Sequence, residues 1–346
     1  AFYNCTGLTS LTIPKNLQSI GSYSFQYCSK IESLNFIENP DSTGLEIGEG
    51  AFSNCTGIKT LKFAAHVKTI GMLAFHNCDQ ITQIDLPKEI TIEDGAFLFC
   101  SRLTKINFHP DGVNSLGDGV FMSCSKLETI EFPKGLNTIP DFFVCNCTSL
   151  NTIKFQNGHT YIEIGSYTFC NCTSLKSFEF LEQITTVGDN AFEGCTGYTG
   201  TLKLDGTTTY GSYAFKNCNK FKNLEFSGSF TTLNDGLFYG CSGFSLLDLP
   251  DDLESIGDYT FYGCSGISGT LTLPKSLTSI GSYAFCQCTS LTGKLDISNV
   301  DDLGEGAFYE CVGFTSLNLS NRLTDIPAYA FYQCSGLNSE ILFPSL

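Results

Sequence analysis

The sequence predicts a repeat solenoid, a stack of short coils joined by parallel strands. One short motif, A-F-x-x-C, recurs from end to end in fifteen copies, at steps of 22 to 27 residues and most often 23. An apolar pattern with strand periodicity follows each copy. A fixed period of this size is typical of stacked-coil proteins, in which each coil buries its apolar side chains against its neighbours. The motif cysteines are Cys5, Cys28, Cys55, Cys78, Cys100, Cys124, Cys147, Cys172, Cys195, Cys218, Cys241, Cys264, Cys288, Cys311 and Cys334.

The first part of each coil is the pattern L-x-x-L-x-I, as in Leu8, Leu11 and Ile13. Its last two apolar residues are two apart with a polar residue between them, which is the period of a strand with one buried face. A proline often follows, as at Pro14 and Pro250. Because proline has no N–H to give to a sheet, we expect the strand to end there.

The second part is a short apolar-x-x-Ile-Gly run, as in residues 17–21. We read it as a brief second strand that ends at a Gly, which supplies a turn conformation. The third part is the A-F-x-x-C motif itself, and the residue after the Gly is usually Asp or Ser, both good N-cap residues. One turn of helix would bring Ala, Phe and Cys inward together, so we expect a short helical turn there.

These repeats resemble leucine-rich repeats, and more narrowly the BspA-like class with its pattern I-G-x-x-A-F-x-x-C-x-x-L-x-x-I-x-I-P. The match covers essentially the whole chain, and residues 256–264 fit it almost letter for letter. The resemblance implies a right-handed leucine-rich-repeat superhelix of about fifteen coils, with parallel strands plus short helical turns. It also implies a cell-surface protein of a host-associated bacterium or parasitic protist, with a role in adhesion and virulence, and it carries over no catalytic residue.

The composition limits the possible partners. The formal net charge is −16, which disfavours nucleic acid and anionic membrane, since both need a basic surface. No stretch approaches the roughly 18 apolar residues of a membrane span, and no signal peptide opens the chain. Both ends fall within the repeat, and no linker interrupts it. We therefore expect one domain, 1–346, cut from a longer protein that carries any signal or anchor.

The cysteines read in two groups. The fifteen motif cysteines occupy one place per coil and are expected to form a buried series of small apolar groups, which we call the cysteine ladder. The other three, Cys145, Cys170 and Cys286, lie two residues before a ladder cysteine. Cys145 and Cys170 hold the same place in consecutive coils, so their side chains should be neighbours. A disulfide, two free thiols, or a zinc site completed by Cys147 and Cys172 are the alternatives.

The polar residue between the last two apolar positions of each strand predicts a continuous polar face. Its sign alternates from Glu131 to Glu225, as expected for favourable pairs across parallel strands. Glu225, Asp248, Thr272 and Asp296 follow as an acidic run without compensating Lys, which suggests a basic partner. The candidate binding face comprises Lys62, Asp85, Glu131, Lys154, Glu179, Lys203, Glu225, Asp248 and Asp296.

No pattern in the sequence indicates a reaction or a cofactor, and no phosphate loop, G-x-S-x-G or H-E-x-x-H occurs. The paired carboxylates Asp251 and Asp252 lack a loop of calcium spacing and read as a solvated turn. N-x-[ST] acceptors for glycosylation occur at Asn4, Asn54, Asn146, Asn171 and Asn318.

The sequence therefore predicts a non-enzymatic adhesion or protein-binding module at the cell surface or secreted, which binds through its strand face or its loops. The alternative is a cytoplasmic protein–protein interaction scaffold of the same fold, which would suit a reduced cysteine ladder. Protein ligands, among them host matrix proteins, are the expected partners, with no nucleic acid and no direct membrane insertion.

Overall fold

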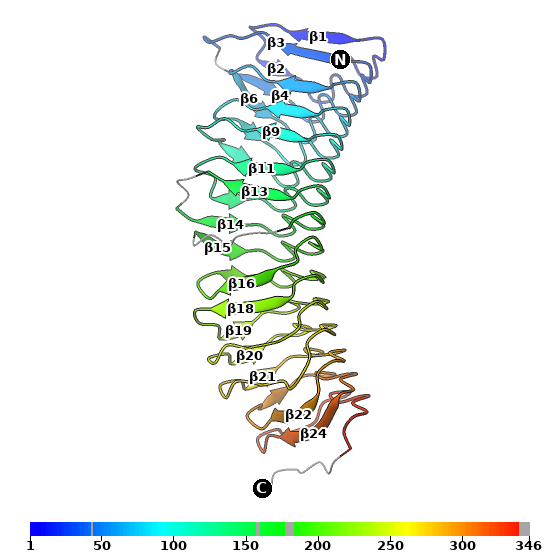
Figure 1. Ribbon diagram of the computed structural model, residues 1–346. Coiled ribbons are helices and arrows are strands. Elements are labelled where there is room, and N and C mark those ends of the chain that lie inside the picture. The colour runs from blue at the N-terminus through cyan, green and yellow to red at the C-terminus, as the bar shows by residue number, and fades with distance from the viewer. Residues whose placement is uncertain (43, 157–159, 177–182, 339–346) are drawn as a thin grey trace. The chain divides into compact units, whose positions relative to one another are not determined.

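A computed structural model describes residues 1–346 except 43, 157–159, 177–182 and 339–346. The chain divides into two compact units, Ala1–Glu179 and Phe180–Leu346. In each unit the coils stack through parallel strand pairs (Figure 1), and this confirms the predicted solenoid. The described part of the chain has about 13 turns, against the fifteen coils expected. Both units are built from the same repeat, and the assignment of 1–346 to a single domain stays a prediction.

The first strand of each coil forms the series that carries the polar face, here called the first-strand series. In the first unit its sheets are β1–β3, β5–β7–β9 and β11–β13, and in the second β16–β18 and β22–β24. The strands are β1 (Ser10–Ile13), β3 (Ser33–Phe36), β5 (Thr60–Lys62), β7 (Gln83–Asp85), β9 (Lys105–Asn107), β11 (Thr129–Phe132), β13 (Thr152–Phe155), β16 (Thr201–Asp205), β18 (Asn223–Ser227), β22 (Gly293–Ile297) and β24 (Phe314–Leu319).

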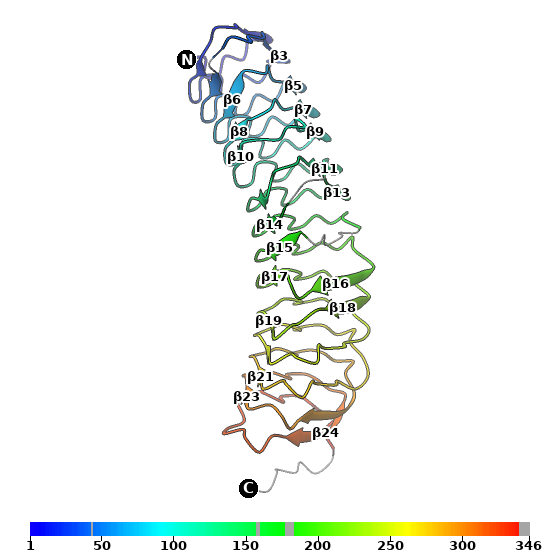
Figure 2. The same ribbon diagram turned by 90° about the vertical axis from the view of Figure 1, so that its left-hand side faces the viewer.

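The short strands before each Gly form the second-strand series. Figure 2 shows that the two series run along opposite edges of the coils within each unit. The strands are β2 (Ser19–Ile20), β4 (Leu45–Ile47), β6 (Val67–Ile70), β8 (Thr91–Ile92), β10 (Ser115–Leu116), β12 (Thr138–Ile139) and β14 (Ile162–Ile164) in the first unit, and β15 (Ile184–Val187), β17 (Thr209–Tyr210), β19 (Thr232–Leu233), β20 (Ser255–Ile256), β21 (Ser279–Ile280) and β23 (Asp302–Leu303) in the second.

The prediction of short helical turns is wrong, because the A-F-x-x-C segments contain no helix in the part of the chain that the structure describes. Alternate amides leave the coil: Phe25 N–H donates to Ala51 O of the next coil at 2.8 Å, whereas Cys28 N–H donates back to Phe25 O at 3.1 Å. Tyr23 and Tyr27 have φ of 55° and 64°. Left-handed residues four apart cannot continue an α-helix, so each segment is a pair of turns that bonds to the next coil.

The predicted N-caps also act between coils. Asp94 Oδ1 accepts the N–H of Asp118 in the next coil at 2.9 Å, and Asp118 Oδ1 accepts the N–H of Asp141 at 3.1 Å. Partial burial, followed by the nearby carboxylate of Asp141, raises the pKa of Asp118. With no helix to cap, the carboxylates satisfy backbone donors one coil further on.

The Gly at the end of the second strand is required for a different reason from the one predicted. Gly71 does not have a left-handed φ. A Cβ there would lie 2.8 Å from Ile47 O and 2.9 Å from Glu49 N of the preceding coil. Gly257 meets the same constraint, at 2.8 Å from Asp235 N. The Gly therefore lets two coils approach closely, which no larger residue could do.

Stacked phenylalanines form the core of both units. In the first, the ring of Phe75 lies between Phe52 and Phe97, with centroids 5.2 and 5.4 Å apart. In the second, the ring of Phe261 lies 5.4 Å from Phe238 and is stacked on it. These rings are fully buried. Since aromatic side chains bury a large apolar area, this stack supplies much of the stability of each unit.

Candidate functional site

The polar side chains of the first-strand series lie in register, as the repeat predicts. Three pairs of opposite charge hold directly opposing positions: Lys62 and Asp85, Glu131 and Lys154, and Lys203 and Glu225. In the last pair Lys203 Nζ lies 3.5 Å from Glu225 Oε2. Glu179, the candidate between Lys154 and Lys203, lies outside the described residues. The role of this face in binding stays a prediction.

Asp85 shows what a closed part of the face looks like. It lies on the middle strand of β5–β7–β9, and its carboxylate accepts hydrogen bonds from Gln83 Nε2 at 2.9 Å and from Asn107 Nδ2. Partial burial acts to raise the pKa of Asp85, but these hydrogen bonds outweigh it and lower the pKa below its usual value. The carboxylate of Asp85 is therefore already used in hydrogen bonds with neighbouring side chains of the face.

The expectation that the acidic run lacks compensating Lys is wrong at both of its ends, since Lys203 also pairs with Glu225. Lys294 Nζ lies 2.9 Å from Asp296 Oδ2 on the same strand, and Asn318 Nδ2 donates to Asp296 Oδ1 at 2.9 Å. Partial burial acts to raise the pKa of Asp296, but the hydrogen bonds from Lys294, Ser298 and Asn318 lower it to about 2. Lys294 and Asp296 are two residues apart on one strand, so their side chains lie on the same face. The prediction compared charges only between neighbouring strands and therefore missed this pair.

The first-strand series opens after β18. This strand pairs with β16 in a two-stranded sheet, and the equivalent segment of the next coil, 244–250, forms no strand. Ser245 N–H donates to Lys222 O at 3.1 Å, but within the described ranges no backbone hydrogen bond then joins 246–249 to β18. The side chain of Leu246 is 68% exposed. One edge of β18 is therefore left unpaired.

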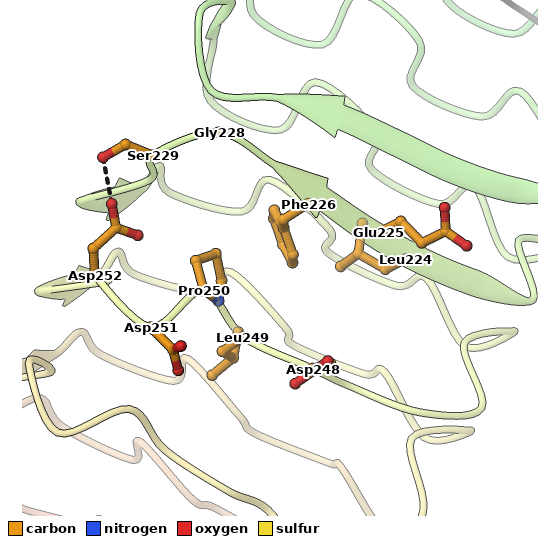
Figure 3. Close-up of a pocket in the computed structure, with 10 residues that line it drawn as sticks. All are labelled: Leu224, Glu225, Phe226, Gly228, Ser229, Asp248, Leu249, Pro250, Asp251 and Asp252. Atoms are coloured by element: carbon orange, nitrogen blue, oxygen red, sulfur yellow. Dashed lines mark hydrogen bonds between the residues drawn. The ribbon is translucent and has the colours of Figure 1, made fainter.

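A cavity of about 650 Å³ lies at this open edge (Figure 3). Figure 3 shows Phe226 of β18 and Pro250 of the next coil pointing into the gap between the two chain segments. Its apolar lining is Leu224, Phe226, Leu249 and Pro250, and its carboxylates are Glu225, Asp248, Asp251 and Asp252. Its volume is typical of ligand-binding clefts in proteins.

Asp252 closes one end of the cavity. Its carboxylate accepts a hydrogen bond from the Ser229 hydroxyl and another from Phe230 N–H at 3.3 Å. The hydrogen bond from Ser229 is the main cause of the lowered pKa of Asp252. Among the described residues, the carboxylates of Asp248 and Asp251 have no cationic partner within 4.0 Å. The cavity is thus lined by carboxylates of which two have no cation beside them in the described part of the chain.

Carboxylates of like charge flank this opening. Glu225 and Asp248 hold equivalent places in adjacent coils, and like charges directly opposite each other destabilise a strand pair. Elsewhere in the second unit Lys203 and Glu225 oppose each other in a closed pair. Interruptions also follow β3 and β9, but there the next coil again has a strand. After β18 the next two coils have none.

The sequence indicated Glu225 and Asp248 but missed the cavity. Asp251 and Asp252 form the exposed turn that was expected. They also line the opening together with Ser229, which was not expected. The available signal was two successive acidic face positions followed by a proline and two more aspartates. Without the broken strand pairing, nothing in the sequence places these residues around one space.

The cysteine ladder is confirmed as a buried series except at its first member, Cys5, which is half-buried. Most ladder thiols donate to the backbone oxygen of the motif residue one coil earlier, as in Cys78 Sγ to Phe52 O at 3.1 Å and Cys241 Sγ to Phe215 O at 3.1 Å. Burial is the main cause that raises the pKa of Cys55 and of Cys147 to about 12. Since the thiolate is the reactive form, these ladder thiols are poor nucleophiles at neutral pH.

Cys145 and Cys170 hold equivalent places in consecutive coils, and both are buried. The backbone there is closely joined, since Asn146 N–H donates to Cys170 O at 2.7 Å. The disulfide between them stays a prediction. The zinc alternative finds no support, because Cys147 and Cys172 turn inward and donate to backbone oxygens at 3.2 and 3.4 Å. In the described residues no group of three or more possible ligands could hold a metal.

Most of the N-x-[ST] asparagines lie in the turns and pair with their neighbours. Asn54 Oδ1 accepts from Asn77 at 2.8 Å, and Asn146 Oδ1 accepts from Asn171 at 3.0 Å. Asn4 is exposed, and Asn318 donates to the strand face. Glycosylation at these positions stays a prediction. No helix in the described parts of the chain is long and apolar enough to cross a membrane.

Comparison with known proteins adds the family relationship. The family model described as "BspA type Leucine rich repeat region" matches the chain in overlapping segments: 1–109, 39–141, 70–199, 142–268 and 267–346. A leucine-rich repeat protein from Bacteroides ovatus has 29% sequence identity and a TM-score of 0.79, over 92% of this chain and 80% of that one. No curated protein matches the chain.

Two more distant structures resemble it. A leucine-rich repeat protein from Eubacterium ventriosum has 21% identity and a TM-score of 0.51, over 78% of this chain and 85% of that one. A leucine-rich cell-surface protein from Faecalibacterium prausnitzii has 21% identity and a TM-score of 0.43, over 86% of this chain and 87% of that one. At this identity the first of the two supports the fold alone.

Proposed function

This chain belongs to the BspA-type leucine-rich repeat family, and on that premise we propose that it is a non-enzymatic protein-binding module of a cell surface that adheres to host matrix or cell-surface proteins. The observation that carries the proposal is the exposed polar face of the first-strand series, whose side chains lie in register along each unit. An ordered array of charged side chains on a rigid scaffold favours recognition of a complementary protein surface.

The chemistry of the described residues also favours binding over catalysis. The cysteine ladder is buried apart from Cys5, and the carboxylates of the face serve hydrogen bonds or ion pairs, as at Asp85 and Asp296. Catalysis needs a nucleophile or base with its pKa tuned to the reaction and a substrate position beside it. Asp248 and Asp251 lie in an open acidic cavity whose chemistry suits a cation.

Binding to a panel of purified, immobilised extracellular-matrix proteins tests this function. We expect at least one to bind, and the charge reversals Lys154→Glu and Lys203→Glu to change that affinity at least fivefold, because both side chains are exposed on the face. Lys15→Glu is the matched control, since Lys15 is exposed but lies outside both strand series. Absence of binding to every protein, or equal effects of face and control variants, would contradict the proposal.

The intracellular scaffold is the second candidate, and the buried cysteine ladder favours it, because a reduced ladder needs no oxidising compartment. Counting thiols by mass after alkylation, first in the folded and then in the denatured protein, separates the two. If Cys145 and Cys170 stay blocked after denaturation, the protein matured in an oxidising compartment and the surface role gains. If all eighteen cysteines label after denaturation, the disulfide is wrong and the intracellular role gains.

A further inference from the structure

We propose that the cavity beside β18 binds an extended, basic segment of a partner protein, which adds to the open edge of β18 as a further parallel or antiparallel strand. This inference rests on the proposed protein-binding function and names the chemistry of the partner at one place on the face. The site is formed by β18 and residues 246–252 and lies entirely within the second unit.

The unpaired edge supplies the first part of the argument. β18 has a strand partner on one side only, and the coil that would cover its other side forms no strand over 246–249. An exposed strand edge presents unpaired N–H and C=O groups, which can pair with an extended chain from another protein. The cavity of about 650 Å³ at this edge leaves room for such a segment.

The two walls of the cavity define which side chains the segment should carry. Along β18, Leu224 and Phe226 face the core side and Glu225 faces outward, because successive side chains of a strand alternate. An added strand would follow the same alternation. Its inward residues would meet apolar groups, among them Leu249 and Pro250, and its outward residues would meet carboxylates. The segment should therefore alternate apolar and basic residues.

Charge complementarity selects the basic partner. Asp248 and Asp251, in the described region, lack a cationic partner within 4.0 Å, whereas Asp296 further along has Lys294 at 2.9 Å. A segment with Lys or Arg at alternate positions would supply the missing charge and relieve the repulsion between Glu225 and Asp248. Exposed pairs of this kind are screened by salt, so the binding should weaken as ionic strength rises.

A labelled eight-residue peptide of alternating Lys and Val, followed by fluorescence anisotropy, tests the inference on the whole chain. We expect saturable binding that weakens at least tenfold in the double variant Asp248→Asn with Asp251→Asn. The matched control Asp325→Asn removes one exposed carboxylate elsewhere in the second unit and should change the affinity less than twofold. Peptide binding that is absent, or equal in the double variant, would overturn the inference.

A second peptide separates strand addition from charge attraction alone. The same sequence with N-methyl groups at every second residue keeps all its charges but loses the N–H donors along one edge, so we expect at least tenfold weaker binding. Equal binding of the two peptides would overturn strand addition. The matrix-protein panel reports separately on the general function: if a matrix protein binds but the Lys–Val peptide does not, this inference alone fails.

Discussion

The sheet β5–β7–β9 of the first unit and the open edge of β18 in the second occupy the same place in the repeat but differ in pairing. In the first, the face residues are Lys62, Asp85 and Asn107, and three strands pair without a gap. In the second, Glu225 is followed by Asp248, and the pairing ends. One repeat therefore forms either a closed face or an unpaired strand edge, and the two regions differ in the polar residue between the two apolar ones.

The side chains that hold the coils together are different from those that form the polar face. Behind both regions the phenylalanine stack and the cysteine ladder continue, although the ring centroids lie 5.4 Å apart for Phe75 and Phe97 and 6.2 Å apart for Phe215 and Phe238. The difference lies in side chains whose cross-strand pairs are each worth only about 0.2–1 kcal/mol. A solenoid can thus open one edge of its face at small cost, because the core and the second-strand series carry most of its stability.

The largest loss of stability is expected from substitutions in the phenylalanine stack, which both regions share. Phe75→Ala in the first unit and Phe238→Ala in the second should each lower the free energy of unfolding by about 3–5 kcal/mol, because both rings are fully buried in the stack. Guanidinium unfolding followed by circular dichroism measures both. A much smaller loss for Phe238→Ala would mean that the core, and not only the face, is loosened beside the open edge.

A smaller loss of stability is expected from adding a side chain where two coils approach each other closely. Gly71→Ala and Gly257→Ala place a Cβ 2.8 Å from backbone atoms of the preceding coil, so each should cost about 1–3 kcal/mol. Gly21→Ala is the matched control, since nothing lies within 4 Å of its added Cβ. The midpoints of thermal unfolding give the comparison, and equal losses at all three positions would refute the close-approach explanation.

Acid should weaken the contacts of Asp296 at a compensated end of the acidic run. The pKa of Asp296 is lowered to about 2 from 3.8, so its ionised form contributes stability above pH 4 that is lost as the pH falls toward 2. Asp296→Asn should flatten the fall of stability in this window relative to the unmodified chain. Unfolding midpoints between pH 2 and 5 measure the difference. An identical pH profile for Asp296→Asn and the unmodified chain would contradict it.

The smallest effect is expected from a substitution that favours strand pairing at the open edge of β18. Asp248→Lys would place a positive charge opposite Glu225 and should raise the free energy of unfolding by about 0.2–1 kcal/mol while slowing amide exchange in β18. Asp248→Asn removes the repulsion without adding attraction and should have an intermediate effect. If neither variant slows exchange, the like charges do not keep this edge open.

The sequence predicted the solenoid, the register of the face and the buried cysteine ladder, because all three follow from a period that every coil repeats. It did not predict the turn geometry of the motif, since the spacing of Ala, Phe and Cys fits a helical turn as well as the alternating turns observed around Phe25. The sequence did not predict the cavity beside β18 either. Strand pairing over 246–249 depends on a balance of small cross-strand terms, which periodicity cannot resolve.

Amide hydrogen exchange of the unmodified chain, with and without the Lys–Val peptide, tests the central claim most directly. In the free protein we predict protected amides in 83–85 and fast exchange in 246–249 and along the open edge of β18, and on adding the peptide we predict slower exchange at that edge alone. Protection of 246–249 equal to that of 83–85 in the free protein would show a closed face there and contradict the claim.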